Sequence, residues 1–368
     1  MSAYVRSALL LGGIMAHFLS LAEAYDLTDT LSINGLLAGT YQYQFLDDGE
    51  NGDDEGGGAV LFQPELSFRP TDRDEFFVKF GFAADNAIND QAPFAVAPWA
   101  ADLEDDVQDI NGRNRDYLFA AWYKHVFQFG PEHELGVSGG IIDATAYLED
   151  TAFADDEFTQ FLNEVFVNGP QSFKPAYDLG GALEWRFNAV ALRMVVMNVG
   201  ANDDGNEYTF FGVQLAYTVD TPLGTGTYRL LGVATTEDFL NAAGTQQEPL
   251  SGLTLSLDQE LGEHLGVFVQ MGWQQDDAAV DFTAMYSGGL HVRGHMWGRP
   301  QDHLGIGYAY LDGGNTGIDR SHVFEAYVRM VLNDMLAVTV ELQYIDEGRE
   351  AGSGLQGWIP GVRLTAAF

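Results

Sequence analysis

Charged and aromatic residues recur at every second or fourth position in several segments of this chain. In the stretch HVFEAYVRMVLNDMLAVTVELQY (322–344), Glu325 and Arg329 are four residues apart, and Glu341 follows in the second half. Guanidinium groups donate hydrogen bonds and carboxylates accept them, so a surface that carries both can satisfy a solute whose hydroxyl groups do both. Trp122 adds an aromatic ring on which an apolar ring face could stack. These residues predict reversible, non-covalent recognition.

The segments that carry these residues have the two-residue period of β-strands. In the stretch 322–344, one face is apolar and the other carries the ionisable side chains, with Asn333 and Asp334 forming a turn between two strands. The segments LLAGTYQYQF, VLFQPELSFR and FFVKFGF repeat the alternation. Sixteen such segments can be counted along the chain.

The connectors between these segments alternate between two lengths. The short connectors are 70–74, 130–134, 188–189, 221–224, 262–264, 298–302 and 333–335. The long connectors are 47–58, 85–114, 143–174, 200–207, 236–249, 275–281, 312–320 and 346–356. Short turns at one end and long loops at the other are typical of outer-membrane barrels. We therefore expect an all-β fold, a sixteen-stranded antiparallel transmembrane β-barrel with short periplasmic turns and long extracellular loops. The alternative is a large soluble β-sandwich, whose inner faces are also apolar.

The positions of the basic residues favour the barrel. Nine of the 17 Lys and Arg residues fall in expected strands, and all nine share the polar face. A basic side chain that faces the middle of a bilayer costs ~2–4 kcal/mol, whereas one that faces a wet lumen costs little. The nine are Arg69, Lys79, Lys124, Arg186, Arg193, Arg229, Arg293, Arg329 and Arg363. Carboxylates expected on the same face are Glu65, Glu184, Asp258, Glu325 and Glu341.

Most of the acidic residues lie in the long connectors, and the formal net charge is -37. An acidic mouth could repel anions and bind divalent cations, or it could keep the surface solvated in a salty habitat. The segment DDGENGDDE lacks the ligand spacing of a helix-loop-helix calcium site, so no metal site is predicted.

The first 24 residues have the features of a secretory signal peptide. Arg6 precedes an apolar stretch, and Ala22-Glu23-Ala24 has the A-x-A form of a cleavage site. We expect residues 1–24 to be removed and residues 25–368 to form the barrel; a short anchor helix is the alternative. The absence of cysteine agrees with an envelope protein that does not depend on disulfides.

Two stretches resemble the carbohydrate-selective outer-membrane porins of the OprB type. In GGIIDATAYLEDTAFADDEFTQFLN (139–163), the matching residues are Gly140, Asp143, Asp150, Asp156, Glu157, Gln160, Phe161, Leu162 and Asn163. In the C-terminal strands they are Glu325, Tyr327, Leu342, Gln343, Tyr344 and Phe368. The stretch LEDDVQDINGRNRDYLFAAWYKHVF is also similar. The chain departs from the family after Leu-Gln-Tyr, where IDEGREAGSGLQG lacks the usual Asn-Pro.

The resemblance implies a channel for facilitated diffusion of mono- or oligosaccharides, narrowed by inward-folded loops. Residues expected to line the pore or contact sugar are Arg69, Lys79, Trp122, Lys124, Glu184, Arg186, Arg193, Arg229, Glu325, Arg329 and Glu341. Residues expected in a constriction or mouth loop are Asp155, Asp156, Glu157 and Gln160. For Trp122 the alternative is an interfacial girdle position, and for Glu325 and Arg329 it is a structural salt bridge in the lumen.

No cofactor, metal or catalytic residue is expected, because no Ser or other nucleophile stands beside a His in a convincing pair. The expected partners are small carbohydrate solutes, outer-membrane lipid and lipopolysaccharide, with no nucleic acid, in a monomer or homotrimer located in the Gram-negative outer membrane. Two rival functions stay open: a general or cation-preferring porin, and a non-transporting surface barrel such as an adhesin or envelope anchor. The sequence leaves open which sugar is carried and which loop narrows the lumen.

Overall fold

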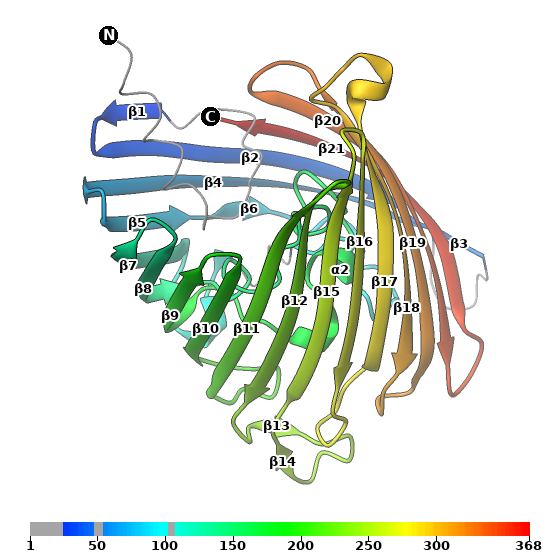
Figure 1. Cartoon of the computed structure of the whole chain (residues 1–368). Coiled ribbons are helices and arrows are strands. Elements are labelled where there is room, and N and C mark those ends of the chain that lie inside the picture. Colours follow the sequence, from blue (N-terminus) through cyan, green and yellow to red (C-terminus); the bar gives the residue numbers. More distant parts are fainter. Residues whose placement is uncertain (1–24, 48–53, 102–106) are drawn as a thin grey trace.

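The alternating segments form antiparallel strands that pair in chain order and close on themselves (Figure 1). The structure is a computed structural model, and it describes residues 25–47, 54–101 and 107–368. The expected signal peptide lies outside the described residues. Strand bounds are β1 Tyr25–Thr28, β2 Leu31–Tyr43, β3 Phe45–Leu46, β4 Gly56–Thr71, β5 Asp74–Phe80, β6 Phe82–Ala84, β7 Leu118–Gly130, β8 His133–Ile142, β9 Asp178–Phe187, β10 Val190–Val199, β11 Tyr208–Thr221, β12 Gly224–Thr235, β13 Phe239–Leu240, β14 Gln247–Glu248, β15 Ser251–Leu261, β16 Leu265–Gln274, β17 Phe282–Arg293, β18 His303–Gly313, β19 Ile318–Val331, β20 Leu336–Arg349 and β21 Leu355–Ala367. The short helices are η1 Ile110–Gly112, α2 Glu164–Val167, η2 Pro170–Ser172 and η3 Gly294–Trp297.

The barrel closes where β21 pairs with β2, from Leu36 opposite Ala367 to Gln42 opposite Gly361. The main sheet has 19 strands, but β1, β3 and β6 are short extensions along the line of another strand. The wall therefore has sixteen strand positions, all antiparallel, which confirms the expected fold class. Among the described residues, no α-helix is long and apolar enough to cross a lipid bilayer.

The two faces of the wall are the faces that the sequence predicts. On β21, Leu364 is 50% exposed while its neighbour Arg363 is fully buried, and on β20 Val340 is 51% exposed while Thr339 is fully buried. The apolar side chains therefore point outward, and the polar ones point into the barrel. A membrane-spanning barrel needs this arrangement, because lipid meets only its outer surface.

Some boundaries differ from the expectation. Strand β17 ends at Arg293, and η3 occupies residues that were expected to continue the strand. The expected loop 236–249 contains the small β13–β14 hairpin. Gly81 separates β5 from β6, and a side chain at this position would collide with the ring of Phe119.

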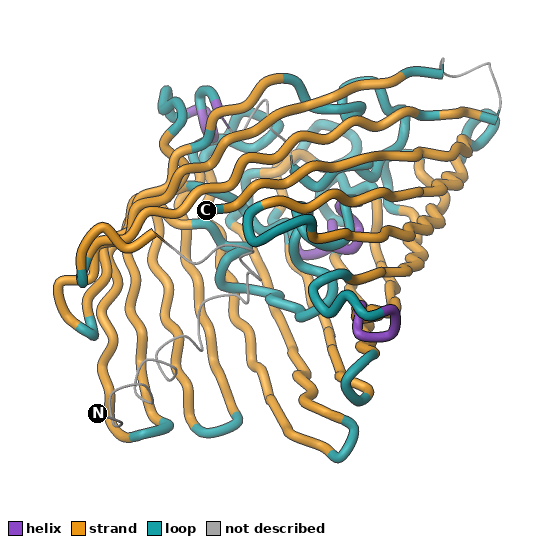
Figure 2. Tube along the Cα trace, turned by 90° about the horizontal axis from the view of Figure 1, so that it is seen from above, coloured by secondary structure: helices purple, strands orange, loops and turns teal. Residues whose placement is uncertain are grey.

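Two long connectors fold into the interior of the barrel, where Figure 2 shows loops inside the ring of strands. We call them loop A (85–117) and loop B (143–177). Loop B places Phe153, Phe161 and Phe166 in one buried cluster with the wall residues Phe268 and Tyr327. The sequence could not indicate which loop narrows the lumen; the structure places both loops there.

Candidate solute passage

Side chains of β19 hold loop B in place by binding its backbone groups. The carboxylate of Glu325 accepts hydrogen bonds from the backbone N–H groups of Leu162, at 2.7 Å, and Asn163, at 2.9 Å. The guanidinium of Arg329 donates to the carbonyl oxygen of Phe158 at 3.2 Å. Backbone groups taken into a protein interior need partners, and these charged side chains provide them.

Strands β18, β20 and β21 add further anchors for loop B. Arg363 donates to the carbonyl oxygens of Glu157 and Gln160, the second at 2.7 Å. Gln343 accepts from the side-chain amide of Asn163 at 2.9 Å and donates to the carbonyl oxygen of Pro98 in loop A at 2.8 Å. His303 Nε2 lies 2.9 Å from the carbonyl oxygen of Thr159. The segment 157–163 is thus bound along its length.

These contacts correct part of the predicted site. Glu325, Arg329 and Glu341 were expected to line the pore or contact sugar, but at most 3% of each is exposed, and loop B covers the first two. Gln160 is also buried, and its side chain joins parts of loop B, donating to the carbonyl oxygen of Ala152 at 3.0 Å. The alternative interpretation, a Glu325–Arg329 salt bridge, is absent from the described contacts; each side chain binds the loop backbone instead. Glu325 and Arg329 therefore position loop B rather than face a solute, and Gln160 lies on the inner loop where it was expected.

A second set of ion pairs holds the start of loop B against β10 and β12. Asp150 lies 2.6 Å from the guanidinium of Arg193 and 3.2 Å from that of Arg229, which also pairs with Asp258. Burial opposes ionisation of Asp150, but the two guanidinium groups outweigh it and lower the pKa of Asp150. Arg193 and Arg229 are therefore matched by carboxylates.

The wall between these two groups of anchors, on β4, β5 and β7, keeps partly exposed side chains. The ring of Trp122 stacks on that of Phe77, with centroids 4.9 Å apart and planes 21° apart. Beside Phe77 on the same strand face, Lys79 Nζ lies 3.7 Å from a carboxylate oxygen of Glu65. Sequence reasoning missed Phe77, although the alternation in FFVKF puts it on the face of Lys79. Lys124 is mostly buried and forms an ion pair with Glu184.

The carboxylates Asp155, Asp156 and Glu157 lie on loop B and are partly exposed. Asp156 accepts hydrogen bonds from the N–H of Phe158 at 2.7 Å and the hydroxyl of Thr159 at 2.8 Å, which shapes the local turn. Burial, together with the neighbouring Asp156 carboxylate, raises the pKa of Glu157 to about 7. Burial also raises the pKa of Asp155 well above its usual range.

Two predicted residues lie close to the short turns. Arg69 forms an ion pair with Glu75 at 2.8 Å, and Arg186 forms one with Glu134 at 3.0 Å. Both pairs are near the periplasmic ends of their strands, away from loop B. They line the exit of the barrel rather than its narrow part.

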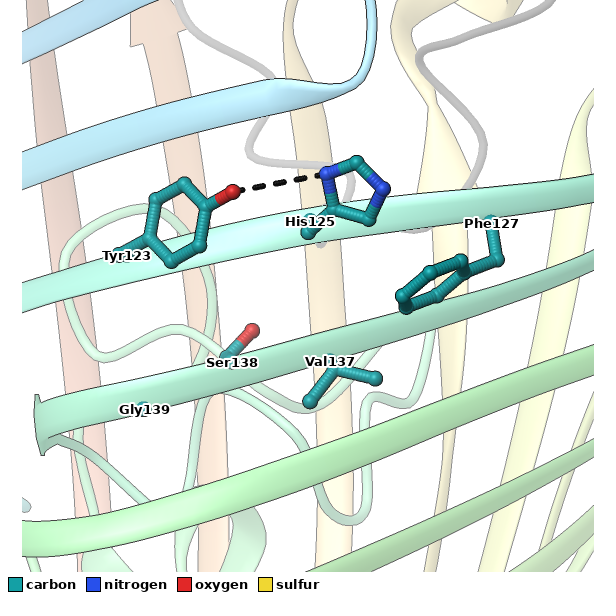
Figure 3. A pocket seen from close by; sticks show the side chains of 6 residues that line it. All are labelled: Tyr123, His125, Phe127, Val137, Ser138 and Gly139. Carbon is teal, nitrogen blue, oxygen red and sulfur yellow. Dashed lines mark hydrogen bonds between the residues drawn. The ribbon is translucent and has the colours of Figure 1, made fainter.

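A separate pocket lies on the outer surface of the barrel. Figure 3 shows it between β7 and β8, lined by Tyr123, His125, Phe127, Val137, Ser138 and Gly139. Tyr123 and His125 alternate with Trp122 and Lys124 along β7, and therefore point away from the lumen. Their polar atoms both contact the carboxylate of Asp74, at 2.5 and 2.7 Å. This pocket faces lipid and is not part of the passage.

Comparison with known proteins identifies the family to which this barrel belongs. Residues 100–368 match the model of the carbohydrate-selective porin, OprB family. The chain belongs to the OprB family of carbohydrate-selective porins. The predicted family, porin fold and function as an outer-membrane carbohydrate channel are thereby confirmed.

Relatives of this OprB-family chain are distant in sequence. An uncharacterized protein of Aquifex aeolicus (strain VF5) is 25% identical over 296 residues, 79% of this chain and 82% of that protein. The high-pH structure of Pseudomonas putida OprB superimposes with a TM-score of 0.74 at 14% identity, covering 92% of this chain and 94% of the other. Pseudomonas aeruginosa OccK11 (OpdR) gives a TM-score of 0.53 at 11% identity, covering 95% and 99%. These two similarities concern the fold.

Proposed function

We propose that mono- or oligosaccharides diffuse through this OprB-family channel between loop B and the wall formed by β4, β5 and β7. The observation that carries this proposal is the stacked pair Phe77–Trp122 beside the ion pair Lys79–Glu65, on the side of the lumen where wall side chains stay partly exposed. No cofactor or energy source is needed for this step, since the solute moves down its own gradient.

The chemistry of this wall suits a sugar. The C–H groups on one side of a pyranose ring are apolar and can pack on an aromatic ring, while the hydroxyl groups both donate and accept. Lys79 supplies donors, and Glu65 supplies acceptors. Contacts of this kind are weak one by one, and a channel needs binding that is loose enough to release the solute.

The surroundings of the barrel fit the same proposal. The apolar outer face would meet outer-membrane lipid, and the long loops would face lipopolysaccharide at the surface of a Gram-negative cell. Export through the expected signal peptide, residues 1–24, belongs to the proposal as well.

The proposal is tested with purified protein in planar bilayers and in liposomes. We expect sugar to enter liposomes and to block the ion current in bilayers. Changing Trp122→Ala should weaken the block by about two- to tenfold, because an aromatic contact contributes ~0.5–1.5 kcal/mol beyond burial. Trp185→Ala is the matched control, since Trp185 is on the outer face and 41% exposed. Sugar entry without any block, in the unmodified chain, would instead support a general porin.

A further inference from the structure

The carboxylates of Asp155, Asp156 and Glu157 are consecutive on loop B inside the barrel, and all three are partly exposed; we call them the acidic face. Among the described residues, none of the three forms an ion pair. Glu157 lies near enough to Lys79 on β5 for that ammonium group to oppose the rise of the Glu157 pKa. The carbonyl oxygen of Glu157 is bound by Arg363 on β21, so the backbone of the acidic face is fixed to the wall while its side chains stay partly exposed.

The basic residues of the wall do not balance this acidic face. Arg329 and Arg363 lie behind loop B, at most 2% exposed, together with Glu325 and Glu341. These two guanidinium groups and two carboxylates have opposite formal charges and are covered by the loop. Their positive charge is therefore separated from the passage by a layer of protein.

The basic residues that remain nearer the passage are matched one by one. Arg193 and Arg229 pair with Asp150, and Arg229 pairs also with Asp258. Lys79 faces Glu65 at 3.7 Å. Lys124 pairs with Glu184. The acidic face thus adds carboxylates beside four basic side chains that are already paired with other carboxylates.

We infer that the acidic face of loop B determines the charge specificity of the channel, so that neutral and amino sugars pass while sugar acids are held back. The inference rests on the proposed sugar route past loop B. Fixed charges of one sign in a narrow pore, where field lines are focused, concentrate ions of the opposite sign and exclude their own sign. Glu157 would then be the main specificity-determining residue, whereas Asp156 also holds the turn and burial disfavours the ionised form of Asp155.

The test measures ion selectivity and sugar entry separately. The reversal potential in a KCl gradient at about pH 8.5, where the carboxyl group of Glu157 is mostly ionised, reports the ratio of potassium to chloride permeability. Liposome swelling with glucose, glucosamine and glucuronate reports sugar entry. We expect a permeability ratio well above unity, and entry of glucose and glucosamine faster than glucuronate.

The double variant Asp155→Asn, Glu157→Gln should lower the permeability ratio by about fivefold, the factor for one like-charge interaction a few ångströms apart in water. Glucuronate should then enter nearly as fast as glucose. The matched control removes the same two charges at exposed short turns, with Asp334→Asn and Glu263→Gln, and should keep the original ratio. The single variant Glu157→Gln gives an independent measurement if the double variant does not fold.

A ratio near or below unity in the unmodified chain would overturn the inference, and so would a ratio that the double variant leaves unchanged. An equal drop in the control variant would also overturn it, since the field would then come from the whole protein. Failure of every sugar to enter, with clear ion conduction, would refute the proposed function instead. The two failures are therefore distinguishable.

Discussion

At the scale of single residues, the charged groups of this barrel divide into two kinds. Glu325, Arg329 and Arg363 are buried and bind the backbone of loop B, whereas Lys79 and Glu157 stay partly exposed near the passage. From the sequence, Glu325, Arg329 and Lys79 were all expected to line the pore or contact sugar. Their role follows from whether a loop covers them.

The anchoring role of Glu325 predicts a change in conductance. Glu325→Ala leaves the N–H groups of Leu162 and Asn163 buried without their acceptor, which costs ~1–3 kcal/mol for each group. Loop B should then move or fluctuate, giving a larger and noisier single-channel current. Glu263→Ala, at an exposed turn, is the control and should keep the original current. A quiet, unchanged current in Glu325→Ala would show that loop B does not need this anchor.

The pKa of Glu157, about 7, predicts a pH-dependent selectivity. The charged groups around it are Asp156 and Asp143 in loop B, Lys79 on β5 and Arg363 on β21. Because the pKa is raised, the carboxyl group is mostly neutral at pH 6 and mostly ionised at pH 8, so negative charge appears in the passage as pH rises. Cation preference, measured from reversal potentials, should increase over this interval, and Glu157→Gln should show a smaller increase. A preference that decreases with pH would contradict this assignment.

At the scale of elements, the packing of loop B depends on glycines in the wall. A Cβ atom at Gly307 on β18 would lie 2.8 Å from the ring of Phe166 and 2.9 Å from that of Phe161. The glycine lets a wall strand and an inner aromatic cluster approach each other. Gly307 does not disturb the inward–outward alternation of side chains along β18. It only leaves more space inside the barrel for the rings of Phe161 and Phe166.

This packing predicts the effect of a larger side chain. Gly307→Val should displace Phe161 and Phe166, since overpacking costs ~1–3 kcal/mol, and should alter the conductance and lower the unfolding temperature. Gly232→Val on β12 is the matched control, because nothing lies within 4 Å of a Cβ atom there. Equal behaviour of the two variants would mean that loop B does not rest on β18 as described.

At the scale of the whole molecule, the outer surface is apolar and the interior is filled by loops. Trp358 is 41% exposed on the outer face, whereas Trp99 in loop A is 1% exposed inside the barrel. In variants that keep a single tryptophan, brominated lipid should quench the fluorescence of Trp358 strongly and that of Trp99 weakly. The reverse order would mean that the wall faces are assigned the wrong way round.

The sequence by itself determined the wall of this barrel. A two-residue period identifies which side chains share a face, and the bilayer penalises a basic residue on the lipid side. The alternation of Val340 with Thr339, and of Leu364 with Arg363, was therefore enough to assign their orientation. The sequence resemblance in residues 139–163 also indicated the family.

Only the tertiary structure decided what lies inside the wall. The path of loop B depends on contacts between residues more than 150 positions apart, such as Leu162 with Glu325 and Phe158 with Arg329. No local period encodes such contacts, because they arise from the closure of the barrel and the volume that its glycines leave free. For this reason Arg329 was recognised as an inward residue from the sequence, but its burial behind loop B was not.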